Sequence, residues 1–219
     1  MAPLRLNLPN SITVARIGAC PLLAALVFSR SALVLFVAFV VFLAAALSDL
    51  WDGYLARKHG WITDTGKLLD PLADKLLLAA TFVPFYVVSH RPDPATDLPW
   101  WGSLPLWVVL IIFGREATVS LVRWWAARRG FVLAAGRSGK LKTLTQNIFS
   151  GALILWYALV RLAADRGWEG SAFWSFWRRL HGSFVGLSLG LALFLTVYSM
   201  GVYYWQNRDL LHGGRAPAP

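Results

Sequence analysis

The sequence predicts an all-α integral membrane protein with six transmembrane helices and a short N-terminal interfacial arm. Hydrophobic residues make up 57% of the 219-residue chain and charged residues only 15%, which is too apolar for an ordinary soluble domain. Apolar stretches also recur along the chain at lengths close to the ~20 residues that cross a bilayer as a helix. The polar segments between these stretches are short, so the chain has no room for a sizeable soluble domain.

The first two predicted helices cover residues 12–28 and 31–57, after an arm of residues 1–9 that we expect along the membrane surface. Asn10 offers N-cap chemistry at the start of the first helix, because its side-chain oxygen can accept a hydrogen bond from a free backbone N–H. Arg16 lies one turn inside the same helix. The second helix is apolar over most of its length and polar toward its end, so we expect that end at one membrane face.

The third and fourth predicted helices cover residues 66–88 and 104–126. The third helix begins with its charged residues, so these lie on the same membrane face as the polar end of the second helix. Residues 90–99 form a loop rich in proline and aspartate on the opposite side. Trp100 and Trp101 follow this loop and are typical of side chains that anchor a chain at the membrane interface.

The fifth and sixth predicted helices cover residues 144–160 and 183–205. Between them, residues 161–181 combine aromatic and basic side chains, which is typical of an amphipathic piece that lies in the interface. We expect one membrane catalytic domain over residues 1–206 and a disordered tail over residues 207–219.

The distribution of basic residues predicts the orientation in the membrane. The formal net charge is +10, which favours anionic lipid headgroups or phosphorylated substrates as partners; the chain carries no motif that indicates nucleic-acid binding. The segments on the side of the charged helix ends carry more of the 21 Lys and Arg residues than the opposite loops. The positive-inside rule therefore places both termini and these helix ends on the cytoplasmic side, and we expect the bacterial cytoplasmic membrane as the location.

Four carboxylates interrupt the apolar sequence at the ends of the second and third helices. Asp49 and Asp52 are three residues apart and Asp70 and Asp74 are four apart, so each pair shares one helix face. Ionisable residues inside membrane segments are costly and therefore indicate a functional site. Four carboxylates at close range need cations, and hard divalent ions such as Mg²⁺ prefer oxygen ligands. The sequence therefore predicts a metal site, with a buried ion network that only joins helices as the alternative.

The spacing of these acids resembles the signature of the CDP-alcohol phosphatidyltransferase family, D-x2-D-G-x2-A-R-x8-G-x3-D-x3-D. The fixed positions of the pattern are Asp49, Asp52, Gly53, Ala56, Arg57, Gly66, Asp70 and Asp74. The resemblance implies the fold of that family, a CDP-activated donor and a homodimer in the membrane. It also implies that Asp74 is the general base and that the other three aspartates are mainly metal ligands. We expect two Mg²⁺ ions, with Mn²⁺ as a possible substitute, bridging the phosphates and stabilising the leaving oxygen.

Small and polar residues near the acids are candidate ligands of the donor, CDP-diacylglycerol. The candidates are Gly53, Ala56, Arg57, Gly66, Asn10 and Thr13. A glycine next to the metal site lets a nucleotide approach the backbone, although close helix packing explains the glycines and Ala56 as well. Arg57 can pair with a phosphate. Helix capping explains Asn10 and Thr13 about equally well.

Basic residues of the fourth helix and of the segment before the fifth are candidate ligands of an anionic acceptor. They are Arg115, Arg123, Lys140 and Lys142. Arg115 and Arg123 are eight residues apart, which is close to two helical turns, so we expect them near one face. Four converging cations would bind a phosphate monoester. Snorkelling of basic side chains to the interface is the alternative, but it explains Arg115 poorly, because this residue lies deeper in the helix.

The segments around the signature narrow the resemblance to members that join CDP-diacylglycerol to sn-glycerol 3-phosphate and release CMP. These segments are residues 7–16, 69–75, 115–123 and 139–146. Members that use phosphatidylglycerol as the acceptor are the alternative, and Lys140 and Lys142 favour the phosphorylated acceptor. A transporter with acids at the membrane midplane is a different class. The acids of this chain lie at helix ends and no inverted repeat is visible, so the sequence favours the transferase. A non-catalytic scaffold is disfavoured because all four acids are intact.

Overall fold

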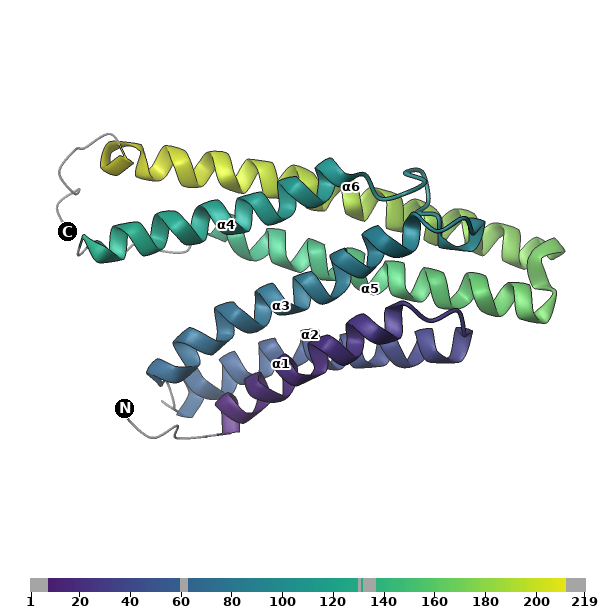
Figure 1. The fold of residues 1–219 in the computed structure, drawn as a ribbon, viewed down its shortest axis with the longest axis horizontal. Coiled ribbons are helices and arrows are strands. Elements are labelled where there is room, and N and C mark those ends of the chain that lie inside the picture. The colour runs from purple at the N-terminus through teal and green to yellow at the C-terminus, as the bar shows by residue number, and fades with distance from the viewer. Residues whose placement is uncertain (1–7, 60–62, 130, 132–136, 212–219) are drawn as a thin grey trace. The chain divides into compact units, whose positions relative to one another are not determined.

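The computed structural model describes residues 8–59, 63–129, 131 and 137–211, and it contains helices and no strand over these ranges (Figure 1). The long helices are α1 (Leu8–Val27), α2 (Ala32–His59), α3 (Asp64–Ser89), α4 (Leu106–Arg128), α5 (Arg137–Arg166) and α6 (Ala172–Leu211). Two short 3-10 helices, η1 (Pro94–Thr96) and η2 (Trp168–Gly170), lie in the α3–α4 and α5–α6 connections. The predicted all-helical fold is confirmed.

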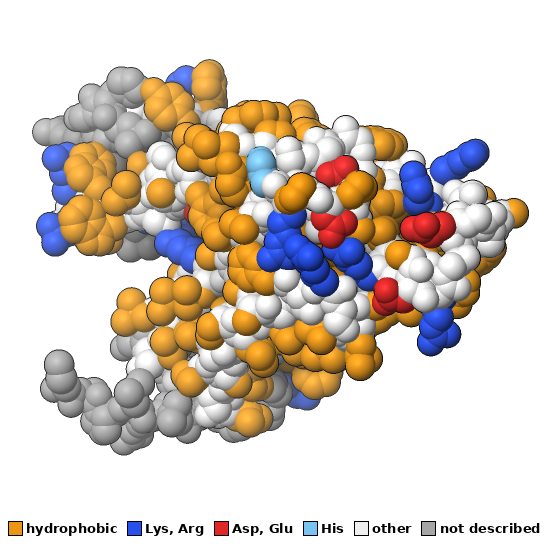
Figure 2. Space-filling model, turned by 45° about the vertical axis from the view of Figure 1, so that its right-hand side comes forward, with side chains coloured by type: hydrophobic (Ala, Val, Ile, Leu, Met, Phe, Trp, Pro, Cys, Tyr) orange, Lys and Arg blue, Asp and Glu red, His pale blue; other side chains and the backbone are white. Residues whose placement is uncertain are grey.

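Five of the six long helices are long and apolar enough to cross a membrane: α1, α2, α3, α5 and α6. α4 is the exception by composition, because every 18-residue stretch of it contains Arg115, Glu116 and Arg123. Large apolar side chains such as Leu33 and Phe194 are exposed on the helices, and hydrophobic side chains cover much of the visible face in Figure 2. The protein is therefore an integral membrane protein whose apolar surface faces lipid.

The helices extend beyond the predicted membrane stretches, because backbone hydrogen bonding continues where the apolar composition ends. α5 begins at Arg137 rather than near residue 144, so Lys140 and Lys142 lie in its first turns and not in a loop. α6 begins at Ala172, so the aromatic residues predicted to form a separate interfacial piece are instead its first turns. α6 also continues to Leu211, into the stretch predicted to be a tail. Residues 1–7 of the predicted arm and residues 212–219 lie outside the described residues.

The chain divides into two compact units, the first made of Met1–Leu104 with Ser150–Val185 and the second of Pro105–Phe149 with Gly186–Pro219. In the first unit, α1 packs against both α2 and α3. The buried residues of α1 recur every three or four positions, so they form one face: Pro9, Asn10, Thr13, Arg16, Cys20, Leu23 and Val27. The N-terminal half of this face is polar and the C-terminal half is apolar, so α1 brings polar groups to one end of the three-helix packing.

Aromatic and small side chains pack the first unit together. Phe85 contacts both Phe82 and Tyr157 edge to face, with ring centroids 6.1 and 6.3 Å apart. A Cβ at Gly151 would lie 3.1 Å from the Phe42 ring, so the glycine lets α5 approach α2 closely. In the α3–α4 connection, Asp93 pairs with Arg161 of α5, and the hydrogen bond from Arg161 holds the pKa of the Asp93 carboxyl below its usual range.

The second unit is built from α4, the first half of α5 and the second half of α6. Its apolar core contains the fully buried side chains Ile112 and Leu189. Gln146 of α5 donates a hydrogen bond to Thr196 of α6 at 3.1 Å, and both side chains are buried. This polar contact fixes the register of two otherwise apolar helices.

Candidate active site

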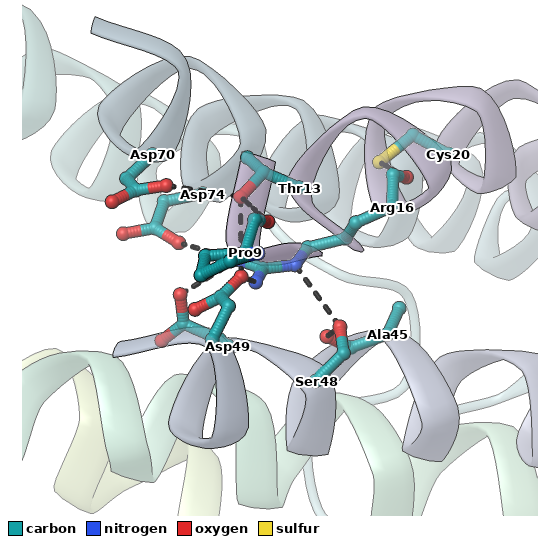
Figure 3. Close-up of polar contacts among 10 residues, drawn as sticks. Pro9, Thr13, Arg16, Cys20, Ala45, Ser48, Asp49, Asp70 and Asp74 are labelled. Atoms are coloured by element: carbon teal, nitrogen blue, oxygen red, sulfur yellow. Dashed lines mark hydrogen bonds and ion pairs between the residues drawn. The ribbon is translucent and has the colours of Figure 1, made fainter. Parts of the chain in front are cut away.

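Four aspartates from two helices gather around the polar end of α1 (Figure 3). α2 contributes Asp49 and Asp52, α3 contributes Asp70 and Asp74, and α1 contributes Arg16. The spacing within each pair places both of its carboxylates on one helix face, as the sequence predicts. Because α1 packs against both α2 and α3, its buried face meets both pairs.

Arg16 contacts three of the four carboxylates. Its Nη1 lies 2.6 Å from Asp49 Oδ1 and 3.6 Å from Asp74 Oδ1, and its Nη2 pairs with the carboxylate of Asp52. Its Nε donates a hydrogen bond to Ser48 Oγ at 3.2 Å. The Arg16 side chain is 0% exposed, so this guanidinium is a buried cation that joins α1 to α2 and α3.

Thr13 links the two aspartate pairs one turn earlier on α1. Its Oγ1 lies 3.2 Å from Asp52 Oδ2, 3.1 Å from Asp70 Oδ1 and 3.2 Å from the carbonyl oxygen of Pro9. A hydroxyl has one hydrogen to donate, so these acceptors share it. Thr13 therefore holds α2 and α3 at hydrogen-bonding distance from one atom.

The four aspartate side chains differ in how much of their surface is exposed. Asp52 is innermost, with only 4% of its side chain exposed, whereas Asp49 is 41% and Asp74 is 48% exposed. Asp70 is also exposed. Three of the four carboxylates can therefore be reached by a ligand, and the fourth is held inside by Arg16 and Thr13.

Asn10 and Gly66 meet beside this cluster, at the start of α3. Thr63 caps α3, since its Oγ1 accepts a hydrogen bond from the N–H of Gly66 at 3.0 Å. The same Oγ1 lies 3.0 Å from Asn10 Nδ2 and 3.1 Å from Asn10 Oδ1. A Cβ at Gly66 would lie only 2.9 Å from Asn10 Oδ1. Close approach of α1 to α3 is therefore sufficient reason for a glycine at this position.

Neither Asn10 nor Thr13 caps α1, so the alternative interpretation of these two residues as helix caps is wrong. α1 begins at Leu8, so Asn10 is already its third residue and contacts the cap of another helix. Thr13 lies a full turn inside the helix and contacts the carbonyl oxygen of Pro9. Both side chains instead line the buried face toward α2 and α3.

The sequence indicated Arg16, with Asn10 and Thr13, as a plausible contact to substrate. Sequence reasoning missed its pairing with the aspartates and the roles of Ser48 and Thr63. One signal was available for Arg16. Asn10, Thr13 and Arg16 follow each other at intervals of three, so they form a polar stripe on an otherwise apolar membrane helix. A buried arginine needs a partner, and the four aspartates are the evident source of one.

The predicted donor ligands Gly53, Ala56 and Arg57 lie in α2, on the turns that follow Asp52. Their side chains lie outside the part of the chain that the structure describes. The structure thus places their backbone next to the acid cluster, and their role as donor ligands stays a prediction.

The acid cluster fits a hard divalent cation in its chemistry, because its potential ligands are carboxylate oxygens and the side chains of Asp49 and Asp74 are nearly half exposed. Over the described ranges, no three acidic, His or Cys side chains are arranged around one metal position. The carboxylates turn instead toward Arg16 and Thr13. The residues present could hold a metal after a rearrangement of these side chains.

A second charged cluster lies in the second unit, where Glu116 contacts two basic side chains. Arg115 Nη1 lies 3.0 Å from Glu116 Oε1, and Lys142 Nζ pairs with the same oxygen. Arg115 and Lys142 are both buried, and Arg115 Nε has no hydrogen-bond partner among the residues that the structure describes. Gly139 lies over the guanidinium, since a Cβ there would be 3.8 Å from Arg115 Nη2. Two of the four predicted acceptor ligands therefore meet around one carboxylate.

The other two predicted acceptor ligands lie apart from this pair. The guanidinium of Arg123 lies over the ring of Tyr203, 5.8 Å from its centroid, and Lys140 is exposed. Helix geometry explains the separation, because eight residues leave Arg123 about 80° around the helix from Arg115. Convergence of all four cations is not seen in the structure.

Most of the chain matches the model of one protein family. The model of CDP-alcohol phosphatidyltransferases matches residues 6–200, which include all six long helices apart from the end of α6. The chain belongs to this family. Its members are generally dependent on divalent metal ions, in agreement with the oxygen-rich donor set described above. The family signature in α2 and α3 is thus the part of this structure that forms the acid cluster.

Relatives of this chain carry two different enzyme names. The CDP-diacylglycerol–glycerol-3-phosphate 3-phosphatidyltransferase of Bacillus subtilis is 33% identical over 217 residues, 94% of this chain and 97% of that protein. The chloroplastic/mitochondrial enzyme 1 of that name from Arabidopsis thaliana is 36% identical over 202 residues, 90% of this chain and 62% of that protein. The cardiolipin synthase (CMP-forming) of rice is 38% identical over 148 residues. These cover 66% of this chain and 44% of the rice protein, so the chain spans less than two thirds of both plant relatives.

Proposed function

We propose that the protein transfers the phosphatidyl group of CDP-diacylglycerol to sn-glycerol 3-phosphate and releases CMP. The observation that carries the proposal is the gathering of the four signature aspartates around Thr13 and Arg16. Family membership supports the CDP-activated donor. The two relatives named for glycerol 3-phosphate, which match 90% or more of this chain, support the acceptor.

In this proposal the carboxylates of Asp49, Asp52 and Asp70, and also that of Asp74, would hold two divalent ions, Mg²⁺ or Mn²⁺. Such ions, when bound, neutralise the diphosphate of the donor and stabilise the leaving phosphate oxygen. Arg57, on the α2 turn after Asp52, pairs with a donor phosphate. The small residues Gly53 and Ala56 leave room for the nucleotide beside α2.

Asp74 is the residue best suited to accept the proton of the acceptor hydroxyl. It is the most loosely held of the three aspartates that contact Arg16, at 3.6 Å compared with 2.6 Å for Asp49, and half of its side chain is exposed. The hydroxyl oxygen forms a bond to the phosphorus of the phosphatidyl group while its proton passes to Asp74. The bond from that phosphorus to the bridging oxygen of the diphosphate breaks, and CMP leaves with the electron pair.

Arg115 and Lys142 bind the phosphate of the acceptor in this proposal. Both are buried cations, so a hydrogen bond from either to a phosphate is stronger than one in water. Within the described part of the chain, Arg115 Nε makes no hydrogen bond and is therefore available as a donor. Lys140 and Arg123 supply additional positive charge at the exposed ends of the same helices.

The surroundings of the enzyme are part of the same proposal. The greater number of basic residues on the side of the acid cluster supports an orientation with the active site facing the cytoplasm of a bacterium. The family resemblance supports a homodimer within the membrane.

The test is CMP release by the purified protein with CDP-diacylglycerol and Mg²⁺. We expect CMP when sn-glycerol 3-phosphate is present and none when EDTA replaces Mg²⁺. Phosphatidylglycerol is the second acceptor to try, because the rice relative is named cardiolipin synthase. CMP release with phosphatidylglycerol and not with glycerol 3-phosphate would move the protein to that reaction.

A further inference from the structure

We propose that Arg16 is the resident cation of the acid cluster, which neutralises Asp49 and Asp52 in the metal-free protein and competes with divalent ions for them. This inference rests on the proposed function, since it concerns the residues that would hold the metal. Arg16 lies outside the family signature, whose fixed positions are all in α2 and α3. Through Arg16, α1 would influence metal binding, although the proposed metal ligands all lie in α2 and α3.

The first argument is geometric. All three guanidinium nitrogens are engaged, by Ser48 at Nε, by Asp49 at Nη1 and by Asp52 at Nη2. Ser48 in turn donates to the carbonyl oxygen of Ala45 at 2.8 Å, so it presents its lone pair to Nε. Each nitrogen of the planar guanidinium group therefore has a hydrogen-bond acceptor. Arg16 therefore holds Asp49 and Asp52 in a defined position through contacts at all three of its nitrogens.

The second argument is electrostatic. One guanidinium faces a cluster of four carboxylates, so the cluster keeps excess negative charge even with Arg16 in place. The excess lies on the outer, exposed acids, which a cation from solution can reach. A divalent ion on Asp49 or Asp52 would share these carboxylates with Arg16 and be repelled by it. Arg16 therefore weakens metal binding and keeps the carboxylates assembled when the metal is absent.

A purely structural role for Arg16 makes a different prediction. If the arginine only joined α1 to α2 and α3, its loss would lower stability equally with and without metal and would not tighten metal binding. If Arg16 competes with the metal, replacement of Arg16 should strengthen metal binding. Bound metal should then restore most of the stability that the replacement removes. Metal affinity without substrate therefore separates the two roles.

The experiment compares Arg16→Gln with the wild-type protein in detergent, without substrates. Mn²⁺ binding is measured by titration calorimetry, and Tm is measured in EDTA and in saturating Mn²⁺. We expect the variant to bind Mn²⁺ at least about tenfold more tightly, because a unit charge near the ion has been removed. We also expect its Tm to fall in EDTA and to recover in Mn²⁺.

Arg91→Gln is the matched control, because it makes the same change of charge at the opposite end of α3. Arg91 follows Ser89 and donates to the carbonyl oxygen of Phe28, roughly 30 Å along the helix from Asp70. We expect this control to leave Mn²⁺ affinity within about twofold of wild type, since charges about three Debye lengths apart interact little. If Arg16→Gln does not fold, Arg16→Lys replaces it in the experiment. This variant should bind Mn²⁺ a few times more tightly than wild type, because an ammonium group cannot pair with Asp49 and Asp52 in the geometry of the guanidinium group.

Unchanged or weaker Mn²⁺ binding in both Arg16 variants would overturn the inference. If the wild type binds Mn²⁺ and releases CMP while the variants do not tighten, the inference alone fails. If the wild type binds no divalent ion, the metal-dependent chemistry of the proposed function fails with it.

Discussion

The acid cluster of the first unit and the basic cluster of the second are built on the same plan with opposite charge. In the first, Arg16 contacts several carboxylates, and in the second, Glu116 contacts Arg115 and Lys142. In each cluster, one residue of opposite charge, Arg16 or Glu116, contacts the side chains that would bind the metal ions or the acceptor phosphate. A buried cluster of like charges needs such a partner while its ligand is absent.

The two clusters differ in which charges are exposed. In the acid cluster the resident Arg16 is 0% exposed, whereas Asp49 and Asp74 are nearly half exposed. In the basic cluster the order is reversed, because Lys142 is 3% exposed and the resident Glu116 side chain is 20% exposed. A metal can therefore reach the outer carboxylates before Arg16 moves, but a phosphate meets Glu116 before it reaches the cations. A metal should therefore bind beside Arg16, although more weakly than it would without this charge, whereas acceptor binding should require Glu116 to move.

The largest effect is expected at the exposed side of the acid cluster. Asp74→Asn should lower turnover by about 10²–10⁴-fold, because an amide keeps the shape but cannot accept the proton. Donor binding should remain, since the other three aspartates are intact. Single-turnover kinetics with a separate CDP-diacylglycerol binding assay measures both, and near-normal turnover would remove Asp74 from the role of base.

A smaller effect is expected in the basic cluster. Arg115→Ala should lower kcat/KM for glycerol 3-phosphate by roughly ten- to a hundredfold, because a charge-assisted hydrogen bond is lost. Arg123→Ala is the control on the same helix, and we expect a smaller loss because Arg123 lies over Tyr203. The measurement is steady-state kinetics with the concentrations of CDP-diacylglycerol and glycerol 3-phosphate varied separately. A change in the KM for CDP-diacylglycerol alone would contradict the assignment of Arg115 to the acceptor.

Glu116→Gln sharpens the contrast between the two clusters. Loss of the carboxylate removes the anion that Arg115 and Lys142 both contact in a buried place, so Tm should fall. If phosphate replaces Glu116, inorganic phosphate should raise the Tm of the variant more than that of the wild type. The measurement is thermal unfolding across a phosphate titration. Equal responses of the two proteins would leave Glu116 as a structural partner only.

The smallest effect concerns the close approach of α1 to α3. Gly66→Ala should destabilise the protein by about 1–3 kcal/mol, because the added Cβ would lie 2.9 Å from Asn10 Oδ1. Gly18→Ala is the control in α1, where a Cβ meets nothing within 4 Å, and helix propensity makes it neutral or slightly stabilising. Denaturant unfolding compares the two, and equal stabilities would contradict close packing at Gly66.

The aspartates and the helices were accessible from sequence because both depend on local periodicity. Spacing of three and four residues places Asp49 with Asp52 and Asp70 with Asp74 on any α-helix, whatever its neighbours. The pairing of Arg16 with Asp49 was not accessible in this way, since these residues are 33 positions apart and meet only through helix packing.

The extents of α5 and α6 and the role of Glu116 escaped prediction for related reasons. Apolar composition marks the part of a helix that lies in lipid, so it misses the polar turns that carry Lys142. Glu116 is adjacent to Arg115 in the sequence, but only the structure shows that Lys142, 26 positions after Glu116, contacts the same oxygen. Long-range pairing of charges therefore remains the part of the site that a single sequence does not determine.

The central claim is that the acceptor carries a phosphate, and the lipid product tests it most directly. The purified protein is given CDP-diacylglycerol, Mg²⁺ and equal amounts of sn-glycerol 3-phosphate and phosphatidylglycerol, and the extracted lipid is analysed by ³¹P NMR. We predict a new lipid with one phosphodiester and one phosphomonoester signal of equal intensity. A new lipid with phosphodiester signals alone would contradict the claim, because it would show transfer to phosphatidylglycerol.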